Sequence, residues 1–224
     1  MNSSQLSEMA RIVREVCCTH GTYESHSPNL HLFVEERPGV PPPAVLNPSI
    51  CLTIQGAKQV FLGDRQFGYA AAEYLLVSID LPLMGRITEA SSAKPFVGLK
   101  VDIDPKRLSA LLMRMDSAPT PMRSSEKGLI VGQADRSLGD ALLRLVGLLE
   151  RPTDIPILHE LILDEIYYRV LSSPYGHALA QMVLDGSRIQ RIAEALKKLK
   201  SDFAQRISVD ELASVSGMSV SSFH

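Results

Sequence analysis

Apolar residues recur at helical spacing near the start of the chain and at strand spacing after Gly21. The first pattern predicts a helix over residues 4–18 with one apolar docking stripe. Its members are Leu6, Met9, Val13 and Val16. The second pattern alternates apolar and polar residues in short runs, as half-buried strands do. These runs predict strands at residues 49–54, 59–62, 67–69, 74–79 and 96–103.

Prolines precede this strand region. Pro38 and the three prolines at 41–43 predict a rigid extended loop, because proline cannot donate a hydrogen bond inside a sheet. Several short strands separated by turns indicate a small antiparallel β-barrel or jelly roll.

The pattern changes at Asp104 and Pro105, where an N-cap residue is followed by proline in the first helical position. Helical patterns occupy the rest of the chain, and the β region is expected to end here. The predicted fold class is therefore α+β.

A leucine seam marks the first long helix of this second part. Its members, at intervals of four, three and four residues, are Leu138, Leu142, Leu145 and Leu149. A second apolar stripe runs from Leu158 to Val170, so the two helices are expected to form an antiparallel hairpin. The seam either covers the barrel or meets its copy in a second subunit as a dimer contact, and the pattern fits both.

The last seventeen residues, 208–224, have the spacing of a helix-turn-helix. Ser208 and Glu211 form a capping box, Gly217 suits the turn, and Ser219 caps a second helix. That second helix has only about one and a half turns before the sequence ends, whereas a recognition helix presents more to the major groove. We therefore expect the motif to be incomplete in this chain. Two short surface helices are the alternative interpretation.

Charge and composition limit the classes of function. With a formal net charge of -2 and 45% hydrophobic residues, the chain has enough material for a core and no overall basic surface. Residues 188–224 carry a small positive excess, which favours a DNA-facing tail. The predicted domains are residues 1–187 and residues 188–224.

The cysteines and the amino terminus indicate a cellular compartment. Two of the three cysteines are adjacent, Cys17 and Cys18, which gives no plausible disulfide framework. No segment has the pattern of a signal peptide or a membrane span. We expect a soluble, cytoplasmic protein with no membrane partner.

Three runs in the strand region resemble the effector domain of AraC-type (AraC/XylS family) transcriptional regulators. They are PSICLTIQGAKQVFLGD at 48–64, AEYLLVSIDLP at 72–82 and PFVGLKVDIDP at 95–105. The tail SVDELASVSGMSVSSFH at 208–224 is similar to the first DNA-reading helix-turn-helix of the same family. The order of the segments also agrees with that family, in which the effector domain precedes the DNA-binding domain.

The resemblance implies a cupin-like sensing barrel, a helical hairpin used for dimerisation, and a DNA-binding domain with two helix-turn-helix units. Only the beginning of the DNA-binding domain is present, so the natural protein is expected to continue beyond His224. The implied partners are an operator DNA, a small-molecule effector and a second copy of the chain. The residues carried over as DNA contacts are Ser219, Ser221, Ser222 and His224.

A sensing barrel must line its pocket with one of the two faces of each strand, and the sequence does not say which. The candidate ligand-binding residues are Thr53, Val60, Leu62, Val77, Met84, Arg86, Leu99 and Val101. An inward Arg86 would favour an effector that carries a carboxylate or phosphate. The alternatives are an Arg86 on the surface and a barrel filled by its own side chains.

A cupin-type metal enzyme is a rival interpretation, because such barrels also hold metals. The six histidines are scattered and include no His-x-His pair, so we expect no catalytic residues, no metal and no cofactor. Another alternative is a dimerising ligand-binding or interaction module without DNA contact, if His224 is the natural end.

Overall fold

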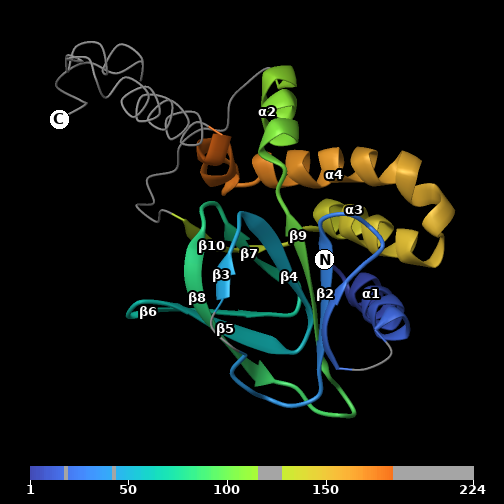
Figure 1. Cartoon of the computed structure of the whole chain (residues 1–224), viewed down its shortest axis with the longest axis vertical. Helices are drawn as coiled ribbons and strands as arrows, with labels where there is room; N and C mark the ends of the chain where they lie inside the picture. The colour runs from blue at the N-terminus through green and yellow to red at the C-terminus, as the bar shows by residue number, and fades with distance from the viewer. Residues whose placement is uncertain (18–19, 42–43, 116–127, 184–224) are drawn as a thin grey trace, which may run out of the picture. The chain divides into compact units, whose positions relative to one another are not determined.

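The computed structural model describes residues 1–17, 20–41, 44–115 and 128–183 (Figure 1). The chain divides into two compact units, Met1–Ala180 and Gln181–His224. The predicted boundary after residue 187 lies outside the described residues, so it stays a prediction. All elements below belong to the first unit.

Six antiparallel strands form the larger sheet, in the order β1-β2-β9-β4-β7-β10. Their bounds are β1 Gly21–Glu24, β2 Leu30–Glu35, β9 Phe96–Asp102, β4 Ser49–Gln55, β7 Glu73–Val77 and β10 Leu129–Gln133. Each strand predicted from alternation is confirmed as a strand within two residues at either end.

Four antiparallel strands form the smaller sheet, in the order β3-β8-β5-β6. Their bounds are β3 Ala44–Leu46, β8 Leu81–Glu89, β5 Ala57–Leu62 and β6 Arg65–Ala70. Gly56 joins β4 to β5 with a φ of +83°, and a Cβ there would lie 2.3 Å from the Glu89 carbonyl oxygen. Only glycine fits this crossing from one sheet to the other.

The predicted α+β class, with antiparallel sheets followed by helices, is confirmed, and the two sheets stay open rather than closing into a barrel. Strand β10 is a second difference. It pairs with β7, Leu129 opposite Val77, although the sequence placed the end of the β region at Asp104. Its pairing partner β7 lies about fifty residues earlier in the chain. The strand was missed because a pattern of neighbouring residues carries no information about so distant a partner.

The described residues of this unit also include the α-helices α1 Ser3–Val16, α2 Pro105–Arg114, α3 Arg136–Gly147 and α4 Ile155–Leu171. Two 3-10 turns, η1 Leu148–Glu150 and η2 Pro152–Asp154, join α3 to α4. The predicted cap is confirmed, because the Asp104 side chain accepts from the backbone N–H of Lys106 and Arg107 at the start of α2. The predicted hairpin is confirmed too, since α3 packs against α4 and against α1.

The leucine seam of α3 lies mostly inside this single chain. Leu138, Leu142 and Leu145 are buried, and Leu149 in η1 is half-buried. Three of the four residues predicted as a dimer contact are therefore not available at the surface, because packing against neighbouring elements already covers them. Within this chain α3 packs mainly against α1 and α4, and the dimer contact at the seam stays a prediction.

The two faces of the six-stranded sheet differ. Helices α1 and α3 lie on the side of β2 and β9 that is away from β5 and β8 (Figure 1). Leu32, Leu99 and Leu52 form a row across β2, β9 and β4 on one face, and all three are buried. The adjacent row on the other face is His31, Lys100 and Cys51. Alternation therefore sends aliphatic side chains to one side and polar ones to the other.

Among the described residues, no helix is long and apolar enough to cross a membrane.

Candidate functional site

A cavity of about 360 Å³ lies between the two sheets. Most of its walls are apolar: Phe33, Pro41, Ala44, Val45, Leu46, Leu52, Val60, Leu83, Ile87, Phe96 and Leu99. The remaining residues that border it are Thr22, His31, Glu35, Cys51, Thr53, Lys58, Tyr69, Gly85, Gly98 and Lys100. The volume is near the lower end of the range of ligand pockets, about 300–1,000 Å³.

Side chains fill the space beside the cavity completely. A buried core cluster between the sheets consists of Cys51, Val60, Tyr69, Leu75, Val77, Leu81, Leu83 and Leu129. Four of its members, Cys51, Val60, Tyr69 and Leu83, also border the cavity. The space between the sheets is therefore solid on one side and hollow on the other.

Lys58 of β5 brings a positive charge to the cavity. Its ammonium nitrogen lies 5.7 Å from the centroid of the Phe33 ring, a cation–π contact. Burial lowers the pKa of Lys58, because an apolar environment disfavours the charged form. Within the described residues, Lys58 has no carboxylate at ion-pair distance. The charge is thus held without a counter-ion.

Gly85 of β8 makes room for this lysine. A Cβ at Gly85 would lie 3.0 Å from Cε of Lys58 and 3.6 Å from its Nζ. A side chain at this position would require the end of Lys58 to shift by a few tenths of an ångström. Gly85 therefore leaves room for Lys58 along the cavity wall.

Thr53 of β4 adds an unpaired hydroxyl. Its side chain is 0% exposed, and Oγ1 has no hydrogen-bond partner among the described residues. Leaving a buried hydroxyl unpaired costs about 1–3 kcal/mol. Because Thr53 borders the cavity, a molecule there can supply the missing partner.

The other cation of the cavity is already paired. Nζ of Lys100 lies 2.9 Å from Oδ1 of Asp102, and Nε2 of His31 lies 2.7 Å from Oδ2 of the same carboxylate. Glu35 at the end of β2 also borders the cavity and makes no ion pair within the described residues. Lys58 is therefore the one lysine of the cavity wall whose charge is not balanced.

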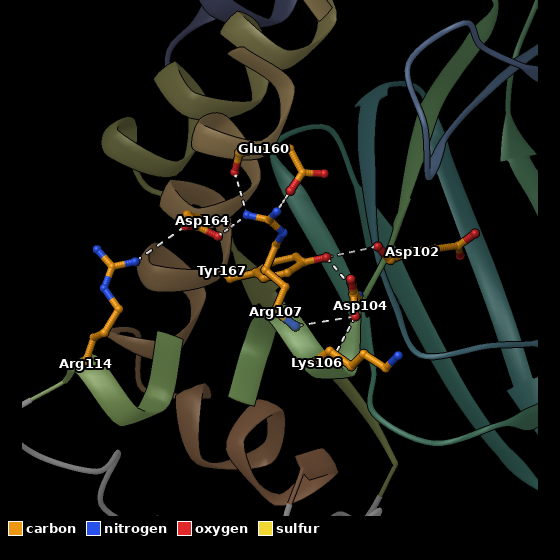
Figure 2. A network of polar contacts seen from close by, with 8 residues as sticks. All are labelled: Asp102, Asp104, Lys106, Arg107, Arg114, Glu160, Asp164 and Tyr167. Carbon is orange, nitrogen blue, oxygen red and sulfur yellow. Dashed lines mark hydrogen bonds and ion pairs between the residues drawn. The ribbon is translucent and has the colours of Figure 1, made fainter. Parts of the chain in front are cut away.

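Polar contacts connect this wall to α4 (Figure 2). The hydroxyl of Tyr167 donates to the backbone oxygen of Asp102 over 3.1 Å and accepts from the backbone N–H of Asp104 over 3.0 Å. Burial raises the pKa of Tyr167 to about 12, so the hydroxyl keeps its proton at neutral pH. The strand end that carries Asp102 is thereby fixed to α4.

A second connection joins α2 to α4. Arg107 Nη1 lies 2.6 Å from an oxygen of Asp164, and Arg107 also forms an ion pair with Glu160 (Figure 2). Arg114 approaches the other oxygen of Asp164 at 3.6 Å. These contacts hold one side of α4, and another side carries exposed apolar residues.

The exposed apolar face of α4 consists of Ile157, Leu158, Leu161 and Tyr168. Ile157 and Leu161 are 70% and 64% exposed, unusually high for side chains of this size. The sequence predicted a single stripe for this helix. The structure divides it, with Ile162, Ile166 and Val170 buried and Leu158 and Leu161 exposed.

Three of the eight predicted ligand-binding residues border the cavity: Thr53, Val60 and Leu99. Leu99 pairs with Leu32 and Leu52, and this row faces the helices. Its side chain therefore follows that row, and its backbone is the part nearest the cavity.

The other five predicted ligand-binding residues lie elsewhere. Val77 belongs to the core cluster and Leu62 packs against it. Val101 is buried in the helix-facing row that also holds Leu30 and Ile50. Met84 and Arg86 are exposed on β8, because the alternate residues Leu83, Gly85 and Ile87 face the cavity. Of the two alternatives for Arg86, the structure has the exposed one.

The sequence did not single out Lys58, Phe33 and Gly85. A signal for Lys58 was present: it lies two residues before Val60 in β5, so both belong to the same face of the strand, and Val60 was among the predicted ligand-binding residues. The predicted strand began at residue 59, which left Lys58 outside it, whereas β5 begins at Ala57.

The predicted DNA contacts Ser219, Ser221, Ser222 and His224 lie outside the described residues. Among the residues that are described, no group of three or more His, Cys, Asp or Glu side chains is arranged to hold a metal ion.

Comparison with known families gives a match over most of the chain. A family model for the AraC-type transcriptional regulator N-terminus matches residues 26–178. No curated protein sequence matches the chain significantly.

Solved structures give a likeness of fold. An apo variant of ToxT from Vibrio cholerae is 10% identical, with a TM-score of 0.50, and the match covers 89% of this chain and 93% of that one. ToxT from the same organism with a bound unsaturated fatty acid is 10% identical, with a TM-score of 0.41 and 87% of each chain covered. The AraC-like transcriptional activator CuxR is 12% identical, with a TM-score of 0.39, covering 88% of this chain and 69% of that one.

Proposed function

The chain belongs to the family of AraC-type transcriptional regulators, and from this premise we propose that it controls transcription in response to a small molecule bound between its two sheets. The observation that carries the proposal is the cavity of about 360 Å³, which lies inside the segment matched by the family model. Its mostly apolar walls with a few polar groups have the composition of a ligand pocket.

We assign operator binding to the helix-turn-helix pattern of residues 208–224. The support is the capping, turn and cap spacing of the sequence together with family membership. Ser219, Ser221, Ser222 and His224 are the residues proposed to face DNA. A regulator of this kind needs no catalytic residues, whereas the metal-enzyme alternative does.

The proposed partner for the exposed face of α4 is a second copy of the chain. Ile157, Leu158, Leu161 and Tyr168 give this face apolar side chains that an isologous contact would bury. This contact replaces the leucine seam as the proposed dimer surface, because the seam is buried within one chain. Leu161→Asp should shift sedimentation toward the monomer, whereas Thr153→Asp, at an exposed position of η2, should not.

A thermal-shift screen tests the sensing part of the proposal. A molecule that binds only the folded state raises the melting temperature by mass action. The matched variant is Val60→Phe, which adds volume at a residue that borders the cavity. We expect the screen to find compounds that raise the melting temperature of the original chain but not that of the folded Val60→Phe variant. Compounds that act equally on both would contradict binding in the cavity.

Selection of genomic DNA fragments tests the regulatory part. The protein is incubated with fragments in the presence and absence of a stabilising compound. Enrichment of particular fragments that changes with the compound is the expected result. No enrichment under either condition would contradict operator binding.

A further inference from the structure

Lys58 is the one cation among the described residues bordering the cavity that has no ion-pair partner. Its stem lies over Gly85, its ammonium faces the ring of Phe33, and within the described residues no carboxylate pairs with it. A buried charge is unfavourable unless something balances it. The cation–π contact offsets part of that cost but brings no negative charge.

An independent observation concerns Thr53 on the opposite sheet. Its buried hydroxyl borders the same cavity and has no hydrogen-bond partner among the described groups. A cation on one wall and a free hydroxyl on the other together specify a ligand group that accepts hydrogen bonds and carries negative charge.

We infer that the cavity binds a small carboxylic acid as its monoanion, with the carboxylate against Lys58 and Thr53 and an apolar body along the aliphatic and aromatic walls. This inference rests on the proposed function, since it specifies the chemical class of the effector.

The charges around the cavity favour a monoanion over a more highly charged ligand. Lys100 is already engaged by Asp102, which leaves one unbalanced cation. A phosphate dianion or a dicarboxylate would need a second cation, and Glu35 would repel its additional charge. One ammonium and one hydroxyl match the two oxygens of a single carboxylate.

The walls also disfavour a sugar or another polyol. Aliphatic and aromatic residues such as Val60, Leu83, Ile87 and Phe96 make up most of the lining. Hydroxyl groups placed against them would lose their hydrogen bonds to water without replacement, which is costly. An apolar body instead gains free energy from burial.

Two matched pairs of probes test the inference by isothermal titration calorimetry. They are 3-phenylpropionate with 3-phenylpropionamide, and octanoate with octanamide, so that each acid is compared with a neutral amide of the same shape. We expect at least one acid to bind about ten- to a hundredfold more tightly than its amide, as a charge-assisted contact predicts.

Lys58→Met should remove this preference for the acid. It should also leave the melting temperature of the free protein unchanged or higher, because it removes a partly buried charge that has no ion-pair partner. Lys58→Arg should retain part of the preference. Lys106→Met, at an exposed position of α2, is the matched control and should change nothing.

Two outcomes would overturn the inference, and they differ in what they say about the proposed function. If acid and amide bind equally and Val60→Phe weakens both, the cavity is a ligand site but not for an anion. If no probe binds the folded protein up to millimolar concentration, both the anion site and the ligand cavity are contradicted. Preference for the acid that persists in Lys58→Met would place the carboxylate elsewhere and overturn the role of Lys58.

Discussion

The two faces of the six-stranded sheet use the same strands for different purposes. The face toward α1 and α3 carries rows such as Leu32, Leu99 and Leu52, all of them buried. The face toward the smaller sheet places His31, Lys100 and Cys51 in the adjacent row, and part of the space it faces is hollow. One face therefore contributes buried aliphatic packing, and the other borders the proposed ligand cavity.

The difference follows from the period of two residues in a strand. Neighbouring residues such as Leu32 and His31 belong to opposite layers, so substitutions one position apart should have very different effects. Each prediction below tests one part of this contrast.

The largest effect is expected for a charge placed in the helix layer. Leu142 of α3 is 0% exposed, so Leu142→Asp should lower the free energy of unfolding by more than about 4 kcal/mol. Urea denaturation followed by circular dichroism measures this loss. Leu161→Asp on the exposed face of α4 is the matched control and should change stability little. A folded Leu142→Asp protein that sediments as a monomer would restore the leucine seam as a dimer contact.

A smaller effect should distinguish the two faces within β2. Leu32→Ala removes a buried side chain and should cost about 2–5 kcal/mol. His31→Ala removes a partly exposed contact with Asp102 and should cost less than about 1 kcal/mol. The same denaturation measurement applies to both variants. An equal or reversed order would contradict the division of roles between the faces.

The connection between the cavity wall and α4 should contribute less. Tyr167→Phe removes the hydroxyl that bonds to the backbone of Asp102 and Asp104, at a cost of about 1–3 kcal/mol. Hydrogen exchange of the amide of Asp104 should become faster in this variant. Exchange that stays unchanged would show that this bond does not hold the strand end to the helix.

The smallest effect is expected for the pH dependence of stability, through a histidine of α4. His159 of α4 contacts the hydroxyl of Ser27 at 2.8 Å, and burial, with a smaller contribution from Arg107, lowers its pKa below the ordinary value of 6.5. The unfolded chain therefore binds more protons than the folded one between these two values. Stability from this group is complete above about pH 6.5 and falls as the pH drops toward the folded pKa.

Stability measured between about pH 7.5 and pH 5.5 tests this prediction. His159→Gln should flatten the pH dependence, whereas His26→Gln, at an exposed position, should leave it unchanged. A pH dependence that is identical in the original chain and in His159→Gln would contradict the assignment.

The sequence was sufficient for the elements whose signal is local. The capped start of α2 at Asp104 and the alternation in β4 and β9 were predicted because neighbouring residues determine them. The pairing of β10 with β7 was missed, since it depends on residues about fifty positions apart. The open edges of the two sheets were missed for the same reason.

The site was harder to predict than the fold. Alternation in β8 offers two sets of residues, and both contain an apolar side chain, Leu83 in one and Met84 in the other. Only the packing of the second sheet decides between them, and it selects Leu83, Gly85 and Ile87. Lys58 was overlooked because the predicted strand began one residue after it, and strand ends are the least certain part of such a prediction.

A crystal structure grown with the most stabilising small molecule tests the central claim most directly. The account predicts electron density for that molecule between the sheets, in contact with Thr53 and Val60. Density for the molecule at another surface, with the space between the sheets empty, would contradict it.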